Sequence, residues 1–496
     1  KCAMFEIASI FRVSVGVLVA MLVALFVVYW FVRDITQKRH TVLRNFPVIG
    51  HLRFFFENLG EYFRQYLFLN DREEMPFNRA PRAWGYRLAK NEGGILGFGS
   101  TYELSQSGAL VFVNAAFPVL DGEFQPTPPV IIGEGWCDNP FAARSVINIS
   151  GMSYGAISQP AVRALSRGAG QSGCYMDTGE GGLSPYHLEG GCDLIYQIGT
   201  AKYGVRDASG RLDPEKLRQV AAQENVRAFE IKLSQGAKPG KGGVLPAAKV
   251  TEEIARIRGI PFGKDSLSPN RHPEIGNMDE LLDMVVRVRE ITGKPVGIKT
   301  AIGGWQFMHQ LVDAIHRRGL GSAPDFLTVD GGEGGSGAAP QALADHMAMS
   351  IKEVLPLVVD ALIESGLRER IKVIASGKLV TPAKVAWALA CGADCINTAR
   401  GYMFSLGCIQ ALRCHQNSCP TGIATHLPRL QRGLVVEDKA ERVAAYTRNL
   451  NKEVEMIAHA CGLRHAREFR REHARVVQPD GKSVALNMLY PYPPTR

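Results

Sequence analysis

Eight short β-rich runs, each followed by a helical or long connecting segment, recur between residues 146 and 401 of this 496-residue chain. They cover residues 146–150, 175–179, 194–199, 228–233, 295–300, 326–332, 372–377 and 395–401. Apolar periodicity predicts helices between several of them, at 158–170, 279–291, 346–366 and 382–391. Strands that alternate with helices pair in parallel, so we expect a (β/α)8 TIM barrel, with an open doubly wound sheet as the alternative.

An uncharged apolar segment at residues 13–32 precedes this region and consists almost entirely of Val, Leu, Ala, Met and Phe. About twenty such residues span a bilayer as a helix, so we expect a single transmembrane helix. Tyr29 and Trp30 lie where an interfacial aromatic belt is found. A cleaved signal peptide fits less well, because its apolar region is shorter and Tyr-Trp-Phe-Val-Arg is a poor cleavage site.

Basic residues are distributed unevenly around this segment. Lys1 and Arg12 precede it, and the basic residues that follow it are Arg33, Lys38, Arg39, Arg44 and Arg53. By the positive-inside rule we expect a single-pass membrane protein with its catalytic domain in the cytoplasm. The net charge is +9, and the basic residues gather here and at 463–475, which favours a membrane-facing surface over a nucleic-acid partner.

The composition along the chain predicts four parts. These are an N-terminal transmembrane anchor at 1–33, a membrane-proximal amphipathic linker region at 34–90, the barrel with an iron–sulfur insertion at 91–462, and a basic C-terminal tail at 463–496. Within the linker, residues 51–68 mix aromatic, aliphatic and charged side chains and predict an amphipathic helix on the membrane or on the barrel. The ten cysteines show no disulfide spacing, which indicates a reducing compartment.

Three of the cysteines, Cys408, Cys414 and Cys419, lie together in the run CIQALRCHQNSCP, with five and then four residues between them. Thiolates are the ligands that iron–sulfur clusters require. Zinc sites normally show pairs of ligands two to four residues apart plus further ligands, of which His415 could be one. Packing of the three thiols in an apolar core is the third alternative, and the spacing leaves all three open.

Glycine-rich segments follow the last three predicted strands, at 330–340, 375–377 and 398–401. Such segments present backbone amides without side chains, and barrels commonly bind phosphate through the loops after strands seven and eight. The phosphate of FMN would fit there, with Arg400 as a fixed positive charge. Turns also use glycine for conformational reasons alone, which is the simpler alternative.

Two lysines end predicted strands: Lys232 in AFEIKL and Lys299 in GIKT. A lysine beside a flavin stabilises negative charge on the reduced ring or polarises a substrate. Exposure to solvent is the alternative for both. The loop that follows Lys232 carries Gln235, Lys238 and Lys241 between glycines and prolines, and it would fold over an acidic substrate.

Four long segments together resemble the FMN-binding synthase domain of the glutamate synthase family, namely ISGMSYGAIS (149–158), IKLSQGAKPGKGGVLPAAKV (231–250), DGGEGGSGAAP (330–340) and GCIQALRCHQNSCPTGIAT (407–425). The resemblance covers residues 95 to 462, and the four segments occur in the same order as in the family. It implies a (β/α)8 barrel that carries FMN and a [3Fe-4S] cluster. It also implies reduction of 2-iminoglutarate, formed from 2-oxoglutarate and ammonia, to L-glutamate.

The resemblance also implies roles for individual residues. The cluster ligands would be Cys408, Cys414 and Cys419. The implied FMN contacts are Ser150, Gly151, Met152, Ser153, Lys299, Asp330, Gly331, Gly332, Ser376, Gly377, Ala399, Arg400 and Gly401. Lys232, Gln235 and Lys299 would position the carboxylates or stabilise charge, and Glu180 would orient the amine side of the substrate.

The chain departs from the family pattern in ways that bear on its partners. Residues 1–496 show no amidotransferase domain, no paired CxxC motifs and no GxGxxG after a strand. Ammonia is therefore expected from outside or from a separate amidotransferase subunit, and electrons from ferredoxin or a reductase subunit. Where many members read Asp-Gly-Gly and Gly-Thr-Gly, this chain has Ala375-Ser376-Gly377 and Ala399-Arg400-Gly401, so Arg400 would compensate at the phosphate.

Within the family, this chain most resembles the stand-alone members that carry an N-terminal membrane anchor. Two alternatives to glutamate formation remain: an amine-exchanging subunit of the N-methylglutamate synthase type, and a non-catalytic membrane electron-transfer subunit. The loop at 232–245 favours an enzyme, because an electron carrier needs no loop that binds carboxylates.

Overall fold

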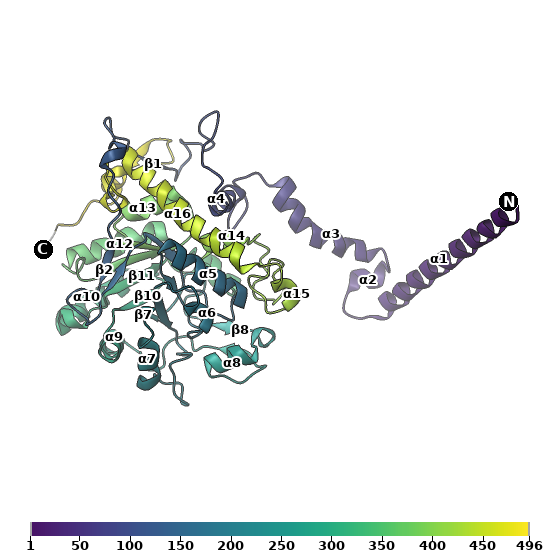
Figure 1. Cartoon of the computed structure of the whole chain (residues 1–496), viewed down its shortest axis with the longest axis horizontal. Helices are drawn as coiled ribbons and strands as arrows, with labels where there is room; N and C mark the ends of the chain where they lie inside the picture. The colour runs from purple at the N-terminus through teal and green to yellow at the C-terminus, as the bar shows by residue number, and fades with distance from the viewer. Residues whose placement is uncertain (1, 495–496) are drawn as a thin grey trace. The chain divides into compact units, whose positions relative to one another are not determined.

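The computed structural model describes residues 2–494, with side chains from residue 15 onward, and the chain divides into two units, residues 1–80 and 81–496. Lys1 and the side chain of Arg12, which enter the charge comparison above, lie outside the described residues. The first unit contains α1 (Cys2–Thr36), α2 (Thr41–Asn45), α3 (Gly50–Phe63) and a π-helical turn η1 (Arg64–Phe68) (Figure 1).

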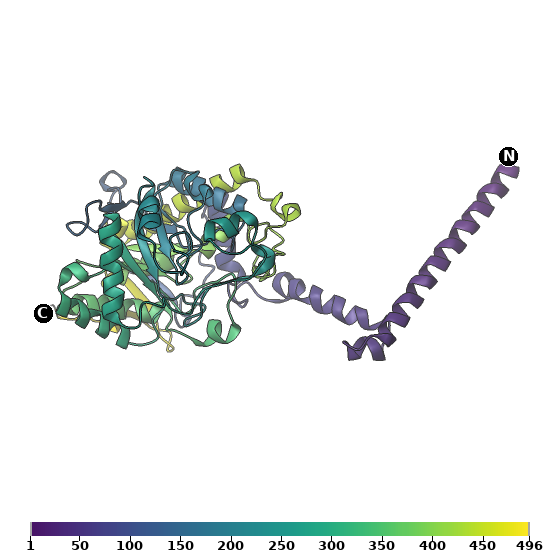
Figure 2. The same cartoon turned by 90° about the horizontal axis from the view of Figure 1, so that it is seen from below.

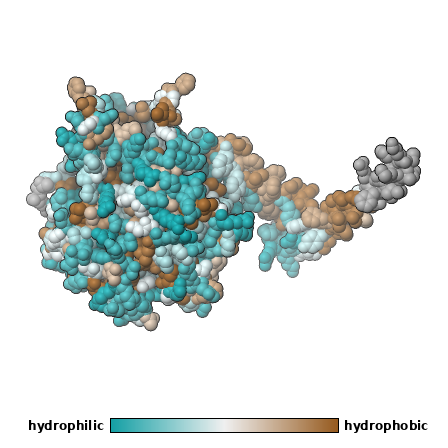
Figure 3. Space-filling view, in the orientation of Figure 1, coloured by the Kyte–Doolittle hydropathy of each residue, from teal (hydrophilic) through white to brown (hydrophobic). Residues whose placement is uncertain are grey.

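The described part of α1 carries apolar side chains on all sides. Val15–Thr36 is long and apolar enough to cross a membrane, and its most apolar 18-residue window is not buried within the structure. Figure 3 shows this apolar surface in brown. The expected helix at 13–32 is thus present, and its place in a membrane stays a prediction.

A buried aspartate, Asp34, joins α1 to the start of α3. Its carboxylate accepts hydrogen bonds from the Val48 N–H at 2.8 Å and from His51 Nε2 at 2.9 Å. The amphipathic segment expected at 51–68 corresponds to α3 and η1, on which Phe55 and Phe68 are exposed. Whether this segment contacts lipid stays a prediction.

Eight parallel strands close into a barrel in the second unit (Figure 1). In order around the barrel they are β4 (Ile147–Ile149), β5 (Met176–Asp177), β6 (Leu194–Ile198), β7 (Val226–Lys232), β10 (Val296–Thr300), β11 (Phe326–Asp330), β12 (Lys372–Ser376) and β13 (Cys395–Thr398). Seven of the eight predicted runs contain one of these strands, and the run at 228–233 overlaps β7, which begins two residues earlier at Val226. The barrel is therefore confirmed and the open sheet is wrong.

The strands are almost wholly buried, because parallel strands in a barrel are covered on both faces. The helices that cover the outside are α5 (Gln159–Ser172), α6 (Pro185–Leu188), α7 (Pro214–Ala221), α8 (Glu252–Arg258), α9 (Met278–Thr292), α10 (Gln306–Arg318), α12 (Ile351–Glu364), α13 (Pro382–Ala390), α14 (Arg400–Leu406) and α16 (Val436–Ala460) (Figures 1 and 2). Helix α9 shows why the boundaries fall where they do. It begins after Asn277, whose side chain accepts from the Glu280 N–H, and ends at Gly293 with a φ of 65°.

The helices predicted at 158–170, 279–291 and 382–391 correspond to α5, α9 and α13. The helix predicted at 346–366 is shorter, since α12 begins at Ile351. The residues before it are held in another way: Met349 donates its N–H to Ile302 O at 2.9 Å and accepts from the Gly332 N–H at 2.7 Å. These bonds join three loops at the carboxyl ends of the strands, so the helix cannot extend into them.

An antiparallel hairpin of β2 (Val130–Ile132) and β3 (Phe141–Ala143) packs near the amino ends of the barrel strands. Its apolar residues form one buried cluster with Tyr175, Phe326 and Cys395, each at or just before the start of a strand. The hairpin therefore covers this end of the barrel. The opposite end, where the strands finish, holds the pocket described below.

The C-terminal segment folds onto the barrel. Strands β1 (Leu110–Phe112), β14 (Ala474–Val477) and β15 (Ser483–Ala485) form a small antiparallel sheet, followed by α17 (Leu486–Leu489). Within the basic stretch at 463–475, Arg471 is fully buried and forms an ion pair with Asp360. This arginine serves internal packing rather than a membrane-facing surface.

The remaining elements are short. They are α4 (Arg79–Ala89), η2 (Asp121–Glu123), β8 (Val244–Leu245), η3 (Ala247–Lys249), β9 (Ser266–Leu267), η4 (Leu320–Ser322), α11 (Gln341–His346), α15 (Pro428–Gln431), η5 (Ala466–Glu468) and η6 (Arg471–His473).

Candidate functional site

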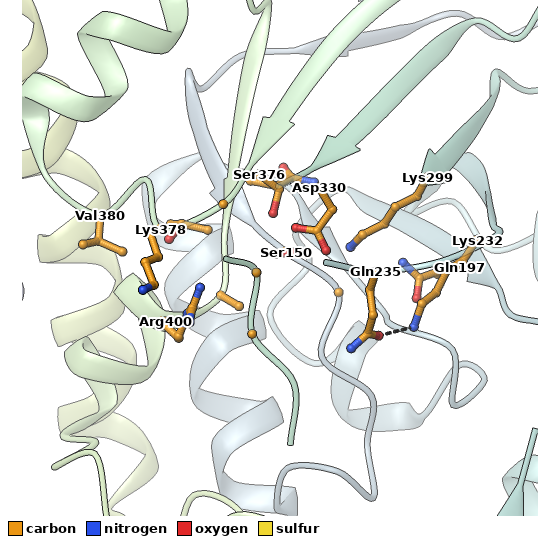
Figure 4. Close-up of a pocket in the computed structure, with 17 residues that line it drawn as sticks. Ser150, Gln197, Lys232, Gln235, Lys299, Asp330, Ser376, Lys378, Val380 and Arg400 are labelled. Atoms are coloured by element: carbon orange, nitrogen blue, oxygen red, sulfur yellow. Dashed lines mark hydrogen bonds between the residues drawn. The ribbon is translucent and has the colours of Figure 1, made fainter. Parts of the chain in front are cut away.

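A pocket opens at the carboxyl ends of the barrel strands. All parallel strands end on one rim, so residues distant in the sequence meet there. The lining residues are Ser150, Gly151, Gln197, Lys232, Gln235, Lys299, Asp330, Gly334, Gly335, Ser376, Gly377, Lys378, Val380, Asn397, Thr398, Ala399 and Arg400. In Figure 4, Lys299, Lys232, Gln235 and Gln197 lie at one end and Lys378, Val380 and Arg400 at the other. The pocket thus has two chemically distinct ends.

At the first end, Lys232 is held by a side chain from its own loop and by one from another loop. Its Nζ donates to Gln235 Oε1 at 2.6 Å (Figure 4) and lies 3.2 Å from Glu180 Oε2. Burial acts to raise the pKa of Glu180, but Lys232 and Lys238 outweigh it and lower this pKa below its usual value. Glu180 is therefore a carboxylate between two ammonium groups. The excess positive charge suits an anionic ligand.

The loop that carries Gln235 is fixed against the end of β11. The Gly236 N–H donates to Asp330 Oδ2 at 2.9 Å, and a side chain at Gly236 would collide with the Gly331 backbone. Only a glycine permits this close approach. The loop at 232–245 is therefore positioned over the pocket by backbone contacts.

Below Lys299 lies a buried network of carboxyl and amide groups. Gln197 Nε2 donates to Glu230 Oε1 at 2.7 Å and to Asp177 Oδ2 at 3.2 Å. The other Glu230 oxygen accepts from Thr328 Oγ1 at 2.6 Å. Each member comes from a different strand, so the barrel fold itself assembles the network.

The charges in this network act on one another. Burial and the neighbouring Glu230 raise the pKa of Asp177 well above its usual value. Burial alone would lower the pKa of Lys299, but Glu230 and Asp330 raise it above its usual value. The neighbouring carboxylates therefore favour the charged form of Lys299, which faces the pocket from the carboxyl end of β10.

The second end of the pocket is basic and rich in glycine. Gly334 and Gly335 line it together with Lys378 and Arg400, and the Arg400 Nη2 donates to Glu333 O at 2.7 Å. Burial lowers the pKa of Arg400 to about 10. Burial also lowers the pKa of Lys384, which lies nearby, to about 8, with the charges of Lys352 and Lys378 adding to the effect. Cations gathered so closely repel one another, and a bound anion would relieve that repulsion.

The structure brings most of the predicted site residues together. Of the expected FMN contacts, the pocket is lined by Ser150, Gly151, Lys299, Asp330, Ser376, Gly377, Ala399 and Arg400. Met152, Ser153, Gly331, Gly332 and Gly401 do not line it. The amides of Gly331 and Gly332 donate to Ser376 O and Met349 O, so loop–loop contacts already use them. Lys232 and Gln235 line the pocket, and Glu180 reaches it through its contact with Lys232.

Sequence reasoning missed several polar residues of the site. Gln197 and Asn397 lie within predicted strands. The sequence does not show whether the polar side chains of a buried strand face the inside or the outside of the barrel. Lys378 follows Gly377 directly, and its φ of 49° turns the chain at the end of β12. A lysine immediately after a glycine at a strand end was the available signal.

Residues 407–427, between α14 and α15, form the cysteine loop, which lies beside the loop that begins at Ser150. The Ser158 N–H donates to Ile423 O at 2.7 Å, and His426 Nε2 lies 2.8 Å from Gly155 O. The three thiols of this loop are free, Cys419 is buried and the other two are half-buried. The cysteine loop is thus attached to a loop that lines the pocket.

The backbone of the cysteine loop has an unusual conformation. Gln410, Leu412 and Asn417 all have positive φ angles, of 58°, 56° and 56°. Three such residues in one short loop are uncommon, and strained backbone gathers at functional sites. Within residues 15–494, no three His, Cys, Asp or Glu side chains stand close enough to hold one metal ion, and His415 is exposed. This geometry gives no support to a zinc site.

The closed barrel and the charged two-ended pocket at its carboxyl rim define an α/β-barrel enzyme. A family profile described as "Conserved region in glutamate synthase" matches residues 109–464. The chain belongs to the glutamate synthase family, and it is an oxidoreductase of the kind that acts on CH–NH2 donors.

Two curated relatives illustrate the match. The glutamate synthase large subunit-like protein YerD of Bacillus subtilis is 40% identical over 497 residues, covering 92% of this chain and 94% of that protein. The archaeal glutamate synthase [NADPH] of Methanocaldococcus jannaschii is 36% identical, covering 69% of this chain and 62% of that protein. The chain thus spans less than two thirds of the archaeal relative.

Among solved structures, a mutant flavocytochrome b2 with pyruvate bound is similar, with a TM-score of 0.45 and 13% identity, covering 89% of this chain and 98% of that chain. The fold described here rests on the strand pairing and not on this likeness.

Proposed function

We propose that this protein is a membrane-anchored FMN and iron–sulfur oxidoreductase that converts 2-oxoglutarate, via 2-iminoglutarate, to L-glutamate with external electrons and ammonia. The pocket with two basic ends carries the proposal: Lys299, Lys232 and Gln235 lie at one end, and Lys378 and Arg400 lie with glycines at the other. A dicarboxylate and a phosphate-bearing cofactor are both anionic, and each end fits one of them.

The residues at the second end fit FMN. A phosphate group at Lys378 and Arg400 would offset the mutual repulsion of the cations there, and the glycine amides approach without side chains. Lys299 would lie against the ring, where its charge favours the anionic reduced form. FMN, when bound, supplies the hydride that reduction of an imine carbon requires.

The first end fits the substrate. Lys232 and Gln235 line this end and would bind the carboxylates, and the charge of Lys238 adds to that of Lys232 beside the single carboxylate of Glu180. Glu180 would accept a hydrogen bond from the substrate nitrogen and orient it. The loop at 232–245 would exclude water from the bound imine, which otherwise hydrolyses.

The cysteine loop fits a cluster with three thiolate ligands. Burial raises the pKa of the Cys408 thiol to about 12, so its thiolate needs a cation beside it, and iron supplies that charge. A multi-iron cluster binds each thiolate to a different iron, so the thiols stand further apart than ligands of one ion.

A change at Lys378 tests the phosphate end. Lys378→Asn removes a charge, and asparagine tolerates the φ of 49° at this position. The affinity for FMN is expected to fall about 10- to 100-fold, since a charged hydrogen bond contributes about 1.5–3 kcal/mol. Titration of deflavinated protein with FMN, followed by fluorescence quenching, measures this.

The same titration has an expected pH dependence. A bound phosphate raises the pKa of Lys384 above its value of about 8 in the free pocket, so FMN binding is strongest below pH 8 and weakens as the pH rises past 8.

The control for Lys378→Asn is Lys372→Ala, at the opposite end of β12. Equal affinity in wild type and Lys378→Asn would contradict the placement of the phosphate.

The N-terminal helix is proposed as the membrane anchor, on the basis of its length and its apolar surface. The full chain is expected to resist extraction from membranes by alkaline carbonate and to require detergent. A variant without residues 1–36 is expected to be soluble with unchanged flavin absorbance, because the pocket residues all lie after residue 81. Extraction of the full chain by carbonate alone would contradict the anchor.

The reaction itself is tested with purified protein that has been reduced chemically under anaerobic conditions. Addition of 2-oxoglutarate and ammonium is expected to reoxidise the flavin and to form glutamate in equal amount. Glutarate, which has the same length and lacks only the oxo group, is the control. Absence of reoxidation with every 2-oxo acid tried would identify an electron-transfer subunit, and turnover with methylamine but not ammonium would identify amine exchange.

A further inference from the structure

Buried lysines in the described part of the chain nearly all face carboxylates. Lys202 pairs with Glu274 at 2.9 Å, and Lys232 lies 3.2 Å from Glu180. Lys238 and Lys299 are likewise next to carboxylates. This is the expected pattern, because a buried ammonium group without a counter-charge is strongly unfavourable.

Lys249 is the exception. Only 2% of its surface is exposed, and its Nζ donates to two carbonyl oxygens, Ala156 O at 2.5 Å and Cys414 O at 3.3 Å. No ion pair of Lys249 with a carboxylate is found among residues 15–494. The groups close enough to attract its charge are the thiols of Cys414 and Cys419, and Arg258 adds a repelling charge. The buried ammonium group of Lys249 therefore has no carboxylate counter-charge among residues 15–494.

An iron–sulfur cluster on the three cysteines would supply that anion. We propose that Lys249 is the counter-charge of this cluster and that its ammonium group raises the cluster's reduction potential. The inference rests on the cluster assigned under the proposed function. Taking up one electron adds one negative charge to the cluster, and a fixed positive charge beside it stabilises the reduced form.

The position of Lys249 also relates the cluster to the pocket. Ala156, whose carbonyl it binds, belongs to the loop that begins with Ser150 and Gly151, which line the pocket. Next to Lys249 in η3, Ala248 O accepts from Asn417 Nδ2 of the cysteine loop at 2.8 Å. Lys249 therefore lies between the two loops. The positive charge of Lys249 therefore stabilises an electron on the cluster, which is the site from which the electron would pass to the pocket.

Redox titration of the purified holoprotein, followed by electron paramagnetic resonance of the cluster, tests this positioning role. Lys249→Gln retains a hydrogen-bond donor for Ala156 O and removes the charge. Its one-electron reduction equilibrium is expected to be at least about tenfold less favourable, which is a potential lower by about 59 mV. Lys249→Arg, which retains the charge, is expected to keep the wild-type potential. Lys202→Gln, at a buried lysine paired with Glu274, is the matched control and is expected to leave the potential unchanged.

Each outcome decides the matter. Loss of iron from Lys249→Gln but not from Lys249→Arg supports the proposal, because charge is then needed to hold the anionic cluster. Iron loss from both variants in protein that still binds FMN overturns it in favour of packing. An unchanged potential in Lys249→Gln also overturns it. Wild-type protein without iron refutes the cluster itself, which separates the failure of the proposed function from that of Lys249.

Discussion

Lys299→Met is expected to lower the rate of substrate-dependent flavin reoxidation by about 10²- to 10³-fold, the usual effect of removing one preorganised group that stabilises developing charge. The ammonium group of Lys299 faces the pocket from the end of β10, and the charges of Glu230 and Asp330 keep it protonated. Anaerobic stopped-flow absorbance with 2-oxoglutarate and ammonium measures the rate.

The same substitution has an expected cost in stability. It leaves Glu230, Asp330 and Asp177 without their nearby cation, and an uncompensated buried charge costs about 3–5 kcal/mol of unfolding free energy. Asp177 already has a folded-state pKa above its unfolded value, so its carboxyl group opposes folding increasingly as the pH rises. Loss of Lys299 enlarges that effect. The stability deficit is expected to be smaller at pH 5 than at pH 8 in urea unfolding.

Lys294→Met is the matched control, since Lys294 lies just before the other end of β10. Its Nζ donates to Ala221 O at 2.6 Å and to Gln223 O at 3.3 Å, away from the pocket. This variant is expected to lose stability while the reoxidation rate per bound flavin stays at the wild-type value. A Lys299→Met protein with bound FMN and full turnover would contradict the role given to Lys299.

Replacement of the loop cysteines is expected to separate electron entry from chemistry. Cys414→Ser removes one thiolate, so the cluster and its paramagnetic signal are expected to be lost. Turnover driven by a one-electron donor protein then falls to background. Chemically reduced flavin is still expected to reoxidise with substrate, because Cys414 does not line the pocket.

Cys391→Ala controls for the loss of a buried thiol. Cys391 is 1% exposed and lies at the end of α13, outside the cysteine loop. Iron content and donor-driven turnover are expected to stay at wild-type levels in this variant. Retention of the full cluster signal in Cys414→Ser would contradict the ligand assignment.

The barrel strands could be predicted because they are nearly continuous apolar runs that end in glycine or polar residues. Local sequence determines both properties. The start of α12 could not be predicted, since it depends on bonds that Met349 makes with Ile302 and Gly332, which are distant in the chain. Pairing of this kind is invisible to any window of sequence.

The site divides in the same way. Lys232, Lys299 and Arg400 stand at strand ends, where a barrel places its functional groups, so their positions could be inferred. The contact of Gln197 with Asp177 and Glu230 depends on which side chains of three strands share one level inside the barrel. That level is set by the stagger of the closed sheet, which the sequence does not display.

The pairing of β1 with β14 has a consequence for how this protein is made. Strand β1 begins at Leu110, and its partner β14 ends at Val477, so the sheet stays incomplete until Val477 has left the ribosome. Helix α1 precedes the barrel in the chain, so the proposed anchor would be available to a membrane before the barrel unit has folded. Ribosome-bound chains that end before Ala474 are expected to be cut by protease near Leu110, whereas finished chains resist.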